Sequence, residues 1–285
     1  MSDNQRQLED SITRDFSTDS ENLSYGAYLD LARLLSSQHP RSTPVLHDEM
    51  LFIIQHQVAE LWLKLLLHEL HSARDLLSGD ELAPALKRLA RIKHVLKQLV
   101  EQWDVLATLT PSEYAQIRPF LATSSGFQSW QYRSVEFILG NKNADMLQVF
   151  DHDPSTHRLL SDLMEEPTVY DEFLRFLHRR GHAVPSSILE RDLTTAWRLH
   201  PALVPVFARI YENSREFWQE YEGCEALVDV EDNFQLWRFR HLKTVERIIG
   251  SKSGTGGSSG VPFLRRALDL TFFPELYAVR AELEA

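Results

Sequence analysis

Cysteine is nearly absent from this chain of 285 residues, and so are several other features. The single cysteine, Cys224, excludes an intrachain disulfide and is typical of a reducing compartment. The most apolar segment, 61–67, is interrupted by Lys64 and is too short to span a bilayer. The first 21 residues are polar and mixed in charge, unlike a signal peptide. We therefore expect a soluble, cytoplasmic protein that makes no use of a membrane.

Positive charge is also in deficit, with 30 lysines and arginines against 41 aspartates and glutamates and a net charge of −11. Such a chain, with no long basic run, is poorly suited to non-specific binding of nucleic acid. The alternating pattern of strands is missing, and so are internal repeats. The sequence predicts one all-α domain over residues 21–285, preceded by a flexible arm at residues 1–20.

Apolar residues recur with helical spacing along most of the chain. The longest helices are expected at 47–77, 81–109, 130–139 and 212–249. Asp80 is suited to cap the second of these helices. In the first helix, Phe52 and His56 lie on one face, whereas Ile54, Val58 and Leu61 lie on nearly the opposite face. A helix that is apolar on both sides is expected to be buried on both sides.

Two histidines lie in apolar helical surroundings far apart in the sequence. His56 shares a face with Phe52, and His241 shares a face with Trp237 and Ile248. A core histidine bonded to a neighbour explains either residue alone. A haem pocket explains both, because one imidazole can ligate the iron while the other acts on the opposite side. Long antiparallel helices would then surround that haem pocket.

Arg118 and Tyr114 lie four residues apart and therefore on one helical face. A guanidinium fork beside a phenol hydroxyl suits a carboxylate ligand, although an exposed arginine beside a half-buried tyrosine also fits. Three basic residues near His241 could meet haem propionates or form a solvated face: Arg238, Arg240 and Lys243.

A glycine-rich loop at 250–260 follows the helix that carries His241, and Thr255 lies inside it. Its G-x-S-x-G pattern has no strand before it, so a nucleophile elbow is excluded. Its glycine spacing also differs from that of a P-loop and of a dinucleotide fold. No Glu-x-x-His pair occurs, which argues against a ferritin-like di-iron bundle. The loop therefore fits a mobile lid over a buried ligand.

Five segments, in order along most of the chain, resemble the bacterial tryptophan 2,3-dioxygenase family. They are LSYGAYL at 23–29, HDEMLFIIQHQ at 47–57 with ELWLK at 60–64, SSGFQSWQYR at 124–133, WRFRHLKTVER at 237–247 and GTGGSSG at 254–260. One glycine loop would be a weak match, whereas five segments together are specific.

The resemblance implies a helical homotetramer that holds haem b with ferrous iron. It also implies insertion of both atoms of O2 across the indole C2–C3 bond of L-tryptophan. The product would be N-formyl-L-kynurenine, in the first step of the kynurenine pathway of tryptophan catabolism. The implied partners are thus L-tryptophan, O2 and neighbouring subunits.

Individual roles carry over onto the matching positions. The resemblance implies that His241 is the axial ligand of the haem iron, with Ser125 and Gly126 near the haem edge. It implies that His56 is catalytic and accepts a hydrogen bond from the indole N–H. The implied substrate pocket also includes Phe52, Ile53, Ile54, Gln55, Tyr114, Arg118 and Thr255, together with Tyr25, Tyr28 and Leu29 of a neighbouring subunit.

Three other functions stay open at this point. An indoleamine dioxygenase of broader specificity is one, although that relative generally lacks a histidine at the position of His56 and is longer. A haem sensor or electron-transfer bundle would explain His241 but neither Arg118 nor a substrate-sized lid. A helical interaction protein with structural histidines would take up no haem at all.

Overall fold

The computed structural model describes residues 23–257 and 259–283, and within these ranges it contains helices and no strand. The predicted all-α class is therefore confirmed. Contacts divide the chain into two units, Met1–Pro40 and Arg41–Ala285. The predicted arm at residues 1–20 lies outside the described residues.

The described part of the first unit contains two short helices, α2 (Tyr25–Tyr28) and α3 (Leu31–Leu34). The hydroxyl of Ser24 caps α2 by accepting a hydrogen bond from the backbone N–H of Ala27. Tyr25 and Tyr28 are 76% and 74% exposed. Large aromatic side chains gain free energy on burial, so their exposure in this unit is an unusual feature.

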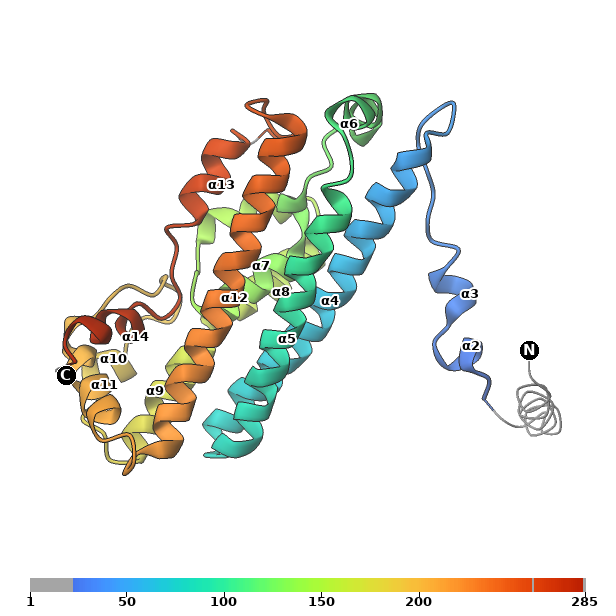
Figure 1. Ribbon diagram of the computed structural model, residues 1–285. Coiled ribbons are helices and arrows are strands. Elements are labelled where there is room, and N and C mark those ends of the chain that lie inside the picture. The colour runs from blue at the N-terminus through green and yellow to red at the C-terminus, as the bar shows by residue number, and fades with distance from the viewer. Residues whose placement is uncertain (1–22, 258, 284–285) are drawn as a thin grey trace, which may run out of the picture. The chain divides into compact units, whose positions relative to one another are not determined.

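Three long helices dominate the second unit: α4 (His47–Ser78), α5 (Leu82–Leu106) and α12 (Trp218–Ile249). α5 lies between the other two (Figure 1). α4 and α5 are antiparallel and are joined by an ion pair between Glu69 and Arg91 at 2.8 Å. α5 and α12 run in the same direction, and Lys93 of α5 forms an ion pair with Asp229 of α12 at 2.7 Å.

Shorter elements lie behind these three helices, on the side of α12 and at the end marked by α6 (Figure 1). They are α6 (Pro111–Ile117), η1 (Arg118–Leu121), η2 (Gly126–Gln128), α7 (Trp130–Leu139), η3 (Ala144–Phe150), α8 (Pro154–Glu165), α9 (Val169–Arg179), α10 (Ser186–Leu189), η4 (Pro201–Leu203), α11 (Val204–Glu212), α13 (Val261–Ala267), α14 (Pro274–Ala278) and η5 (Val279–Ala281). α6 lies at the end of the unit where α4 begins and where α5 and α12 end.

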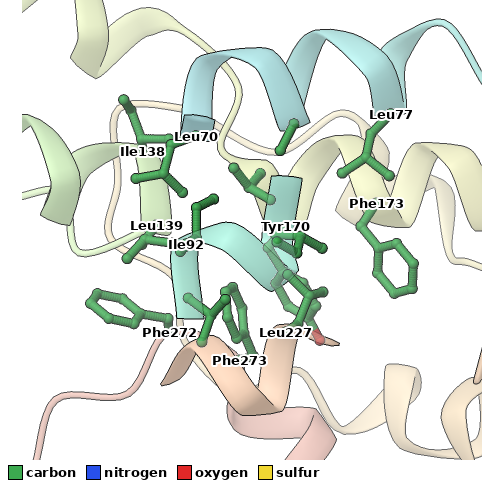
Figure 2. Close-up of a cluster of buried hydrophobic side chains, with 14 of the residues drawn as sticks. Leu70, Leu77, Ile92, Ile138, Leu139, Tyr170, Phe173, Leu227, Phe272 and Phe273 are labelled. Atoms are coloured by element: carbon green, nitrogen blue, oxygen red, sulfur yellow. The ribbon is translucent and has the colours of Figure 1, made fainter. Parts of the chain in front are cut away.

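The main hydrophobic core lies where α4, α5, α7, α9 and α12 meet. Figure 2 shows Leu70 and Leu77 of α4, Ile92 of α5 and Tyr170 and Phe173 of α9 within it. A smaller apolar cluster occupies the end near α6 and contains Trp103, Leu106, Leu109, Ile117 and Ile248. The two histidines singled out from the sequence belong to this same end of the unit, because α4 begins there and α12 ends there.

Three predicted helix boundaries are wrong, one of them the end of the helix predicted at 81–109, which ends at Leu106. Asp80 is not the N-cap of α5: it adopts a left-handed φ of 63°, and the helix begins after Glu81 without a side-chain cap. The helix predicted at 212–249 begins only at Trp218, because a turn in which Phe217 donates to the carbonyl of Asn213 separates it from α11. The helix predicted at 130–139 is confirmed, and α4 exceeds its predicted 47–77 by one residue.

The outer face of α4 also differs from the expectation. Ile54, Val58 and Leu61 are 44%, 37% and 49% exposed, so this helix is not buried on both sides in the single chain. By length and composition α4 is the one described helix that could cross a membrane, yet its other face fills the protein core, as core helices of soluble proteins do. Helical periodicity reports an apolar face but not what covers it.

A buried ionic network holds α12 against α7. The Arg238 guanidinium donates to a carboxylate oxygen of Glu136 at 3.0 Å and to the Leu270 carbonyl at 2.8 Å. Glu136 also accepts from the Tyr132 hydroxyl and from Arg133. The possibility that Arg238 lies on a solvated face or meets a propionate is therefore wrong, because only 3% of it is exposed and both of its terminal nitrogens, Nη1 and Nη2, are already bonded within the protein.

We expect Gly223→Ala to destabilise the protein, although alanine favours a helix by about 1 kcal/mol over glycine. A Cβ at Gly223 would lie 2.6 Å from the ring of Phe173, which is only 1% exposed and cannot move aside. Overpacking of this kind costs about 1–3 kcal/mol, so the net change in unfolding free energy is negative. Urea unfolding measures it, with Gly26→Ala as the matched helical control because no atom lies within 4 Å there. Unchanged stability of Gly223→Ala would contradict this packing.

Candidate active site

Phe52 and His56 lie one turn apart near the start of α4. Their ring centroids are 4.3 Å apart, and the Phe52 ring is 6.1 Å from that of Tyr114 in α6. The helix periodicity predicted the first contact, and the fold adds the second by bringing α6 against α4. These three rings form an aromatic wall at the end of the unit where α4 begins.

The proton position on His56 follows from its hydrogen bond. Its Nδ1 lies 2.7 Å from the carbonyl oxygen of Phe52, and a carbonyl can only accept. Nδ1 therefore carries the proton in the neutral ring, and Nε2 presents a lone pair. Desolvation lowers the pKa of His56, opposed by the bond to Phe52 and the charge of Glu60. The side chain is accessible to solvent even so, which is typical of the wall of a recess.

His241 lies in α12 against α5. The indole of Trp103 stacks on its imidazole with centroids 4.7 Å apart and planes within 9°. Burial, together with the charge of His56, lowers the pKa of His241 to about 4. The imidazole is therefore neutral at pH 7, with a lone pair available to a metal. The electrostatic coupling also indicates that the two histidines, distant in sequence, are close in space.

Tyr114 and Arg118 are presented by α6 and the start of η1. Thr110 begins α6 with a capping box, in which it exchanges hydrogen bonds with Glu113. One arm of Arg118, Nη2, donates to the Ser253 carbonyl at 2.6 Å. The other arm, Nη1, is buried and has no hydrogen-bond partner among the described residues. An unpaired buried donor of this kind is suited to an acidic ligand.

A cavity of about 750 Å³ adjoins these residues. It is lined by Pro111, Tyr114, Ala115, Arg118, Glu246, Arg247, Ile248, Ile249, Gly250, Lys252 and Ser253. Its wall combines apolar side chains with a few charged groups, which is the usual composition of a small-molecule site. The volume is ample for an amino acid.

The described part of the glycine-rich loop is docked onto the segment before η2. The Thr255 hydroxyl donates to the Ser124 carbonyl at 2.6 Å. A Cβ at Gly256 would lie 2.6 Å from the Cβ of Ser125, so only glycine allows this approach. Thr255 and Ser125, predicted from separate motifs, are thereby brought together with Arg118, which holds the same loop through Ser253.

The other predicted site residues are distributed differently. Gln55 is buried and Ile53 half-buried, whereas Ile54 points to the exposed face of α4. Gly126 begins η2, next to Ser125. Tyr25, Tyr28 and Leu29 belong to the first unit, where all three are exposed.

Trp103 was missed by reasoning from sequence. Its position in the repeating apolar face of α5, with Leu96, Leu99 and Leu106, predicts burial but not a stack on His241. The Ser253 carbonyl was missed as well, because a backbone acceptor leaves no signal in the sequence.

These helices define an all-α protein with a cavity of small-molecule size beside Tyr114 and Arg118 and with two histidines at the same end of the unit. A family profile described as Tryptophan 2,3-dioxygenase matches residues 9–206 and 200–283. Proteins named Tryptophan 2,3-dioxygenase from Saccharopolyspora erythraea and Kineococcus radiotolerans are similar to this chain, at 64% identity over 98% of this chain and 99% of the relative, and at 63% over 99% and 97%. One from Serratia proteamaculans is 55% identical over 99% of this chain and 100% of its own length. The chain belongs to the tryptophan 2,3-dioxygenase family.

We expect Gly256→Ala to undock the loop, because its new Cβ would collide with Ser125. Trypsin should then cleave after Lys252 several times faster than in the unmodified protein. The double variant Gly256→Ala with Ser125→Gly removes the opposing Cβ and should restore slow cleavage. If Gly256→Ala alone is cleaved no faster, the loop does not depend on this approach.

Proposed function

We propose that this chain catalyses the dioxygenation of tryptophan from which its relatives take their name, at the site around His56 and His241. L-tryptophan and O2 are the substrates, N-formyl-L-kynurenine is the product, and the reaction opens the kynurenine pathway. The observation that carries the proposal is the geometry of His56. Its Nδ1–H bond to the Phe52 carbonyl leaves Nε2 free to accept a hydrogen bond from an indole N–H.

The residues present fit a haem. His241 is neutral and half-buried, and its imidazole makes no hydrogen bond with the described residues, so its lone pair is available to iron. The described residues contain no group of three or more His, Cys, Asp or Glu side chains that could hold a bare metal ion. A haem needs only one such ligand, since the macrocycle supplies four donors. His241 would hold haem b, with Ser125 and Gly126 near its edge, and the ferrous haem would supply activation of O2.

His56 acts by positioning. Burial keeps its pKa below the ordinary value, so the ring stays neutral and its Nε2 accepts rather than donates. An indole N–H is far too weakly acidic to lose its proton to such a group. The hydrogen bond instead fixes the rotation of the indole ring, while Phe52 packs against its face. Ile53 and Gln55 shape the same turn of α4.

Arg118, Tyr114 and Thr255 bind the amino-acid end of the substrate. The unpaired Nη1 of Arg118 suits the carboxylate, and the Tyr114 hydroxyl can add a further bond. The docked loop brings Thr255 to the same end, where its hydroxyl can meet the ammonium or the carboxylate. A closed loop also excludes water from the reacting indole.

Competitive inhibitors test these roles separately. Indole-3-propionate carries only the carboxylate of tryptophan, and tryptamine carries only the ammonium. Arg118→Met should raise the inhibition constant of indole-3-propionate by on the order of 10- to 100-fold and leave that of tryptamine within about 3-fold, as expected for one charged hydrogen bond. Arg247→Met, which removes another arginine of the cavity wall, is the matched control and should change neither. Equal losses for both inhibitors would refute the carboxylate role.

The proposal extends to a soluble, cytoplasmic homotetramer in which the first unit of one subunit completes the pocket of another. Tyr25, Tyr28 and Leu29 are exposed apolar side chains in that unit, which supports a partner for them. The exposed face of α4, with Ile54 and Val58, supports a further contact between subunits. Residues 1–20 would form the arm that precedes this contact, and residues 21–285 the catalytic domain.

Mixed subunits test the shared pocket. Tyr28→Ala removes the donated side chain, and Arg118→Met damages the recipient pocket, so each variant alone should lose most of its activity. Co-expression of the two should restore activity, because some pockets then combine an intact Tyr28 with an intact Arg118. No recovery in mixed assemblies whose composition is verified by mass spectrometry would show that each subunit completes its own pocket.

A further inference from the structure

One contact at the site has no role in the reaction described above. The indole of Trp103 in α5 lies parallel to the imidazole of His241 in α12, with 4.7 Å between centroids and 9° between planes. Trp237, one turn before His241, contacts the same ring at 5.6 Å but is tilted by 41°. Trp103 is thus the one aromatic neighbour among the described residues that lies flat on this imidazole.

A histidine that ligates a metal is usually oriented by a hydrogen bond from its other ring nitrogen to a carboxylate, carbonyl or water. The described residues give His241 no such bond. Among the described residues, what restricts rotation about the bond from Cβ to the ring is packing. A parallel indole restricts it strongly, because turning the imidazole would drive its edge into the neighbouring face.

Trp103 is not the residue that packing alone would favour. Its Nε1–H is buried and has no hydrogen-bond partner among the described residues. Leaving such a donor unpaired costs about 1–3 kcal/mol, and leucine or phenylalanine in the same cluster would avoid this cost. The large flat ring provides in return a surface that covers the imidazole.

We propose that Trp103 is a positioning residue that sets the rotation of the His241 imidazole plane by stacking. This inference rests on the proposed function, in which His241 ligates the haem iron. The plane of an axial imidazole governs its overlap with the iron d orbitals. Trp103 therefore acts on the metal through His241 without touching metal or substrate.

The test is spectroscopic and uses the haem-loaded protein. Resonance Raman of the ferrous form reports the iron–histidine stretching band, and electron paramagnetic resonance of the ferric cyanide form reports the orientation of the imidazole. Trp103→Leu should shift and broaden the band and alter the g-values, because the ring would adopt several rotations. Trp103→Phe retains a flat aromatic surface and should stay close to the unmodified protein.

Leu106→Ala is the matched control. Leu106 lies on the same helix and in the same apolar cluster but is not in ring contact with His241. It should lower the midpoint of thermal unfolding and leave both spectra unchanged. If Trp103→Leu gives the spectra of the unmodified protein, or if Leu106→Ala alters them equally, the inference is overturned.

A second variant covers the case in which Trp103→Leu does not fold. In His241→Gly supplied with free imidazole, the bound ring has no covalent link to the backbone. Only the surrounding side chains, Trp103 among them, can then orient it. We expect one sharp band at the position of the unmodified protein, and a broad or displaced band would overturn the inference. Failure of the unmodified protein to bind haem would instead refute the proposed function, so the two failures are distinguishable.

Discussion

The ion pair between Arg238 and Glu136 is the constraint on which the site depends. Both side chains are almost fully buried, and the pair joins α12 to α7. Removing one partner of such a pair costs about 3–5 kcal/mol, because the other charge stays buried without compensation. The pair fixes the rotation of α12 about its own axis. His241, one turn further along, is thereby held against Trp103 of α5.

Local signals in the sequence predicted those parts of the fold that depend on local chemistry. The uninterrupted patterns at 47–77 and 130–139 are examples, and both helices form as expected. The break before Trp218 could not be predicted, because no proline or glycine marks it. The exposure of Ile54 could not be predicted either, since apolar spacing is the same whether a helix faces a core or another subunit.

In the candidate site, too, local sequence signals predicted some features and tertiary contacts determined the others. His56 and His241 were singled out because histidine is unusual in such apolar helices, and Tyr114 and Arg118 because their spacing places them on one face. Family resemblance gave all four their roles. Two contacts could not be predicted from residue spacing because they depend on the tertiary structure. They are the stacking of Trp103 on His241 and the hydrogen bond from Arg118 Nη2 to the Ser253 carbonyl. Arg238 was misjudged for the same reason, because its buried acidic partner is 102 residues away in the sequence.

The bond between His56 and residue 52 is made to a backbone carbonyl and not to a side chain. Any amino acid other than proline can supply that acceptor while the helix persists. The tautomer of the histidine is thus uncoupled from the identity of its aromatic neighbour. The side chain at position 52 can therefore change shape in evolution or by design, and a ring of different size can be accommodated there, while the imidazole of His56 keeps the same protonated nitrogen.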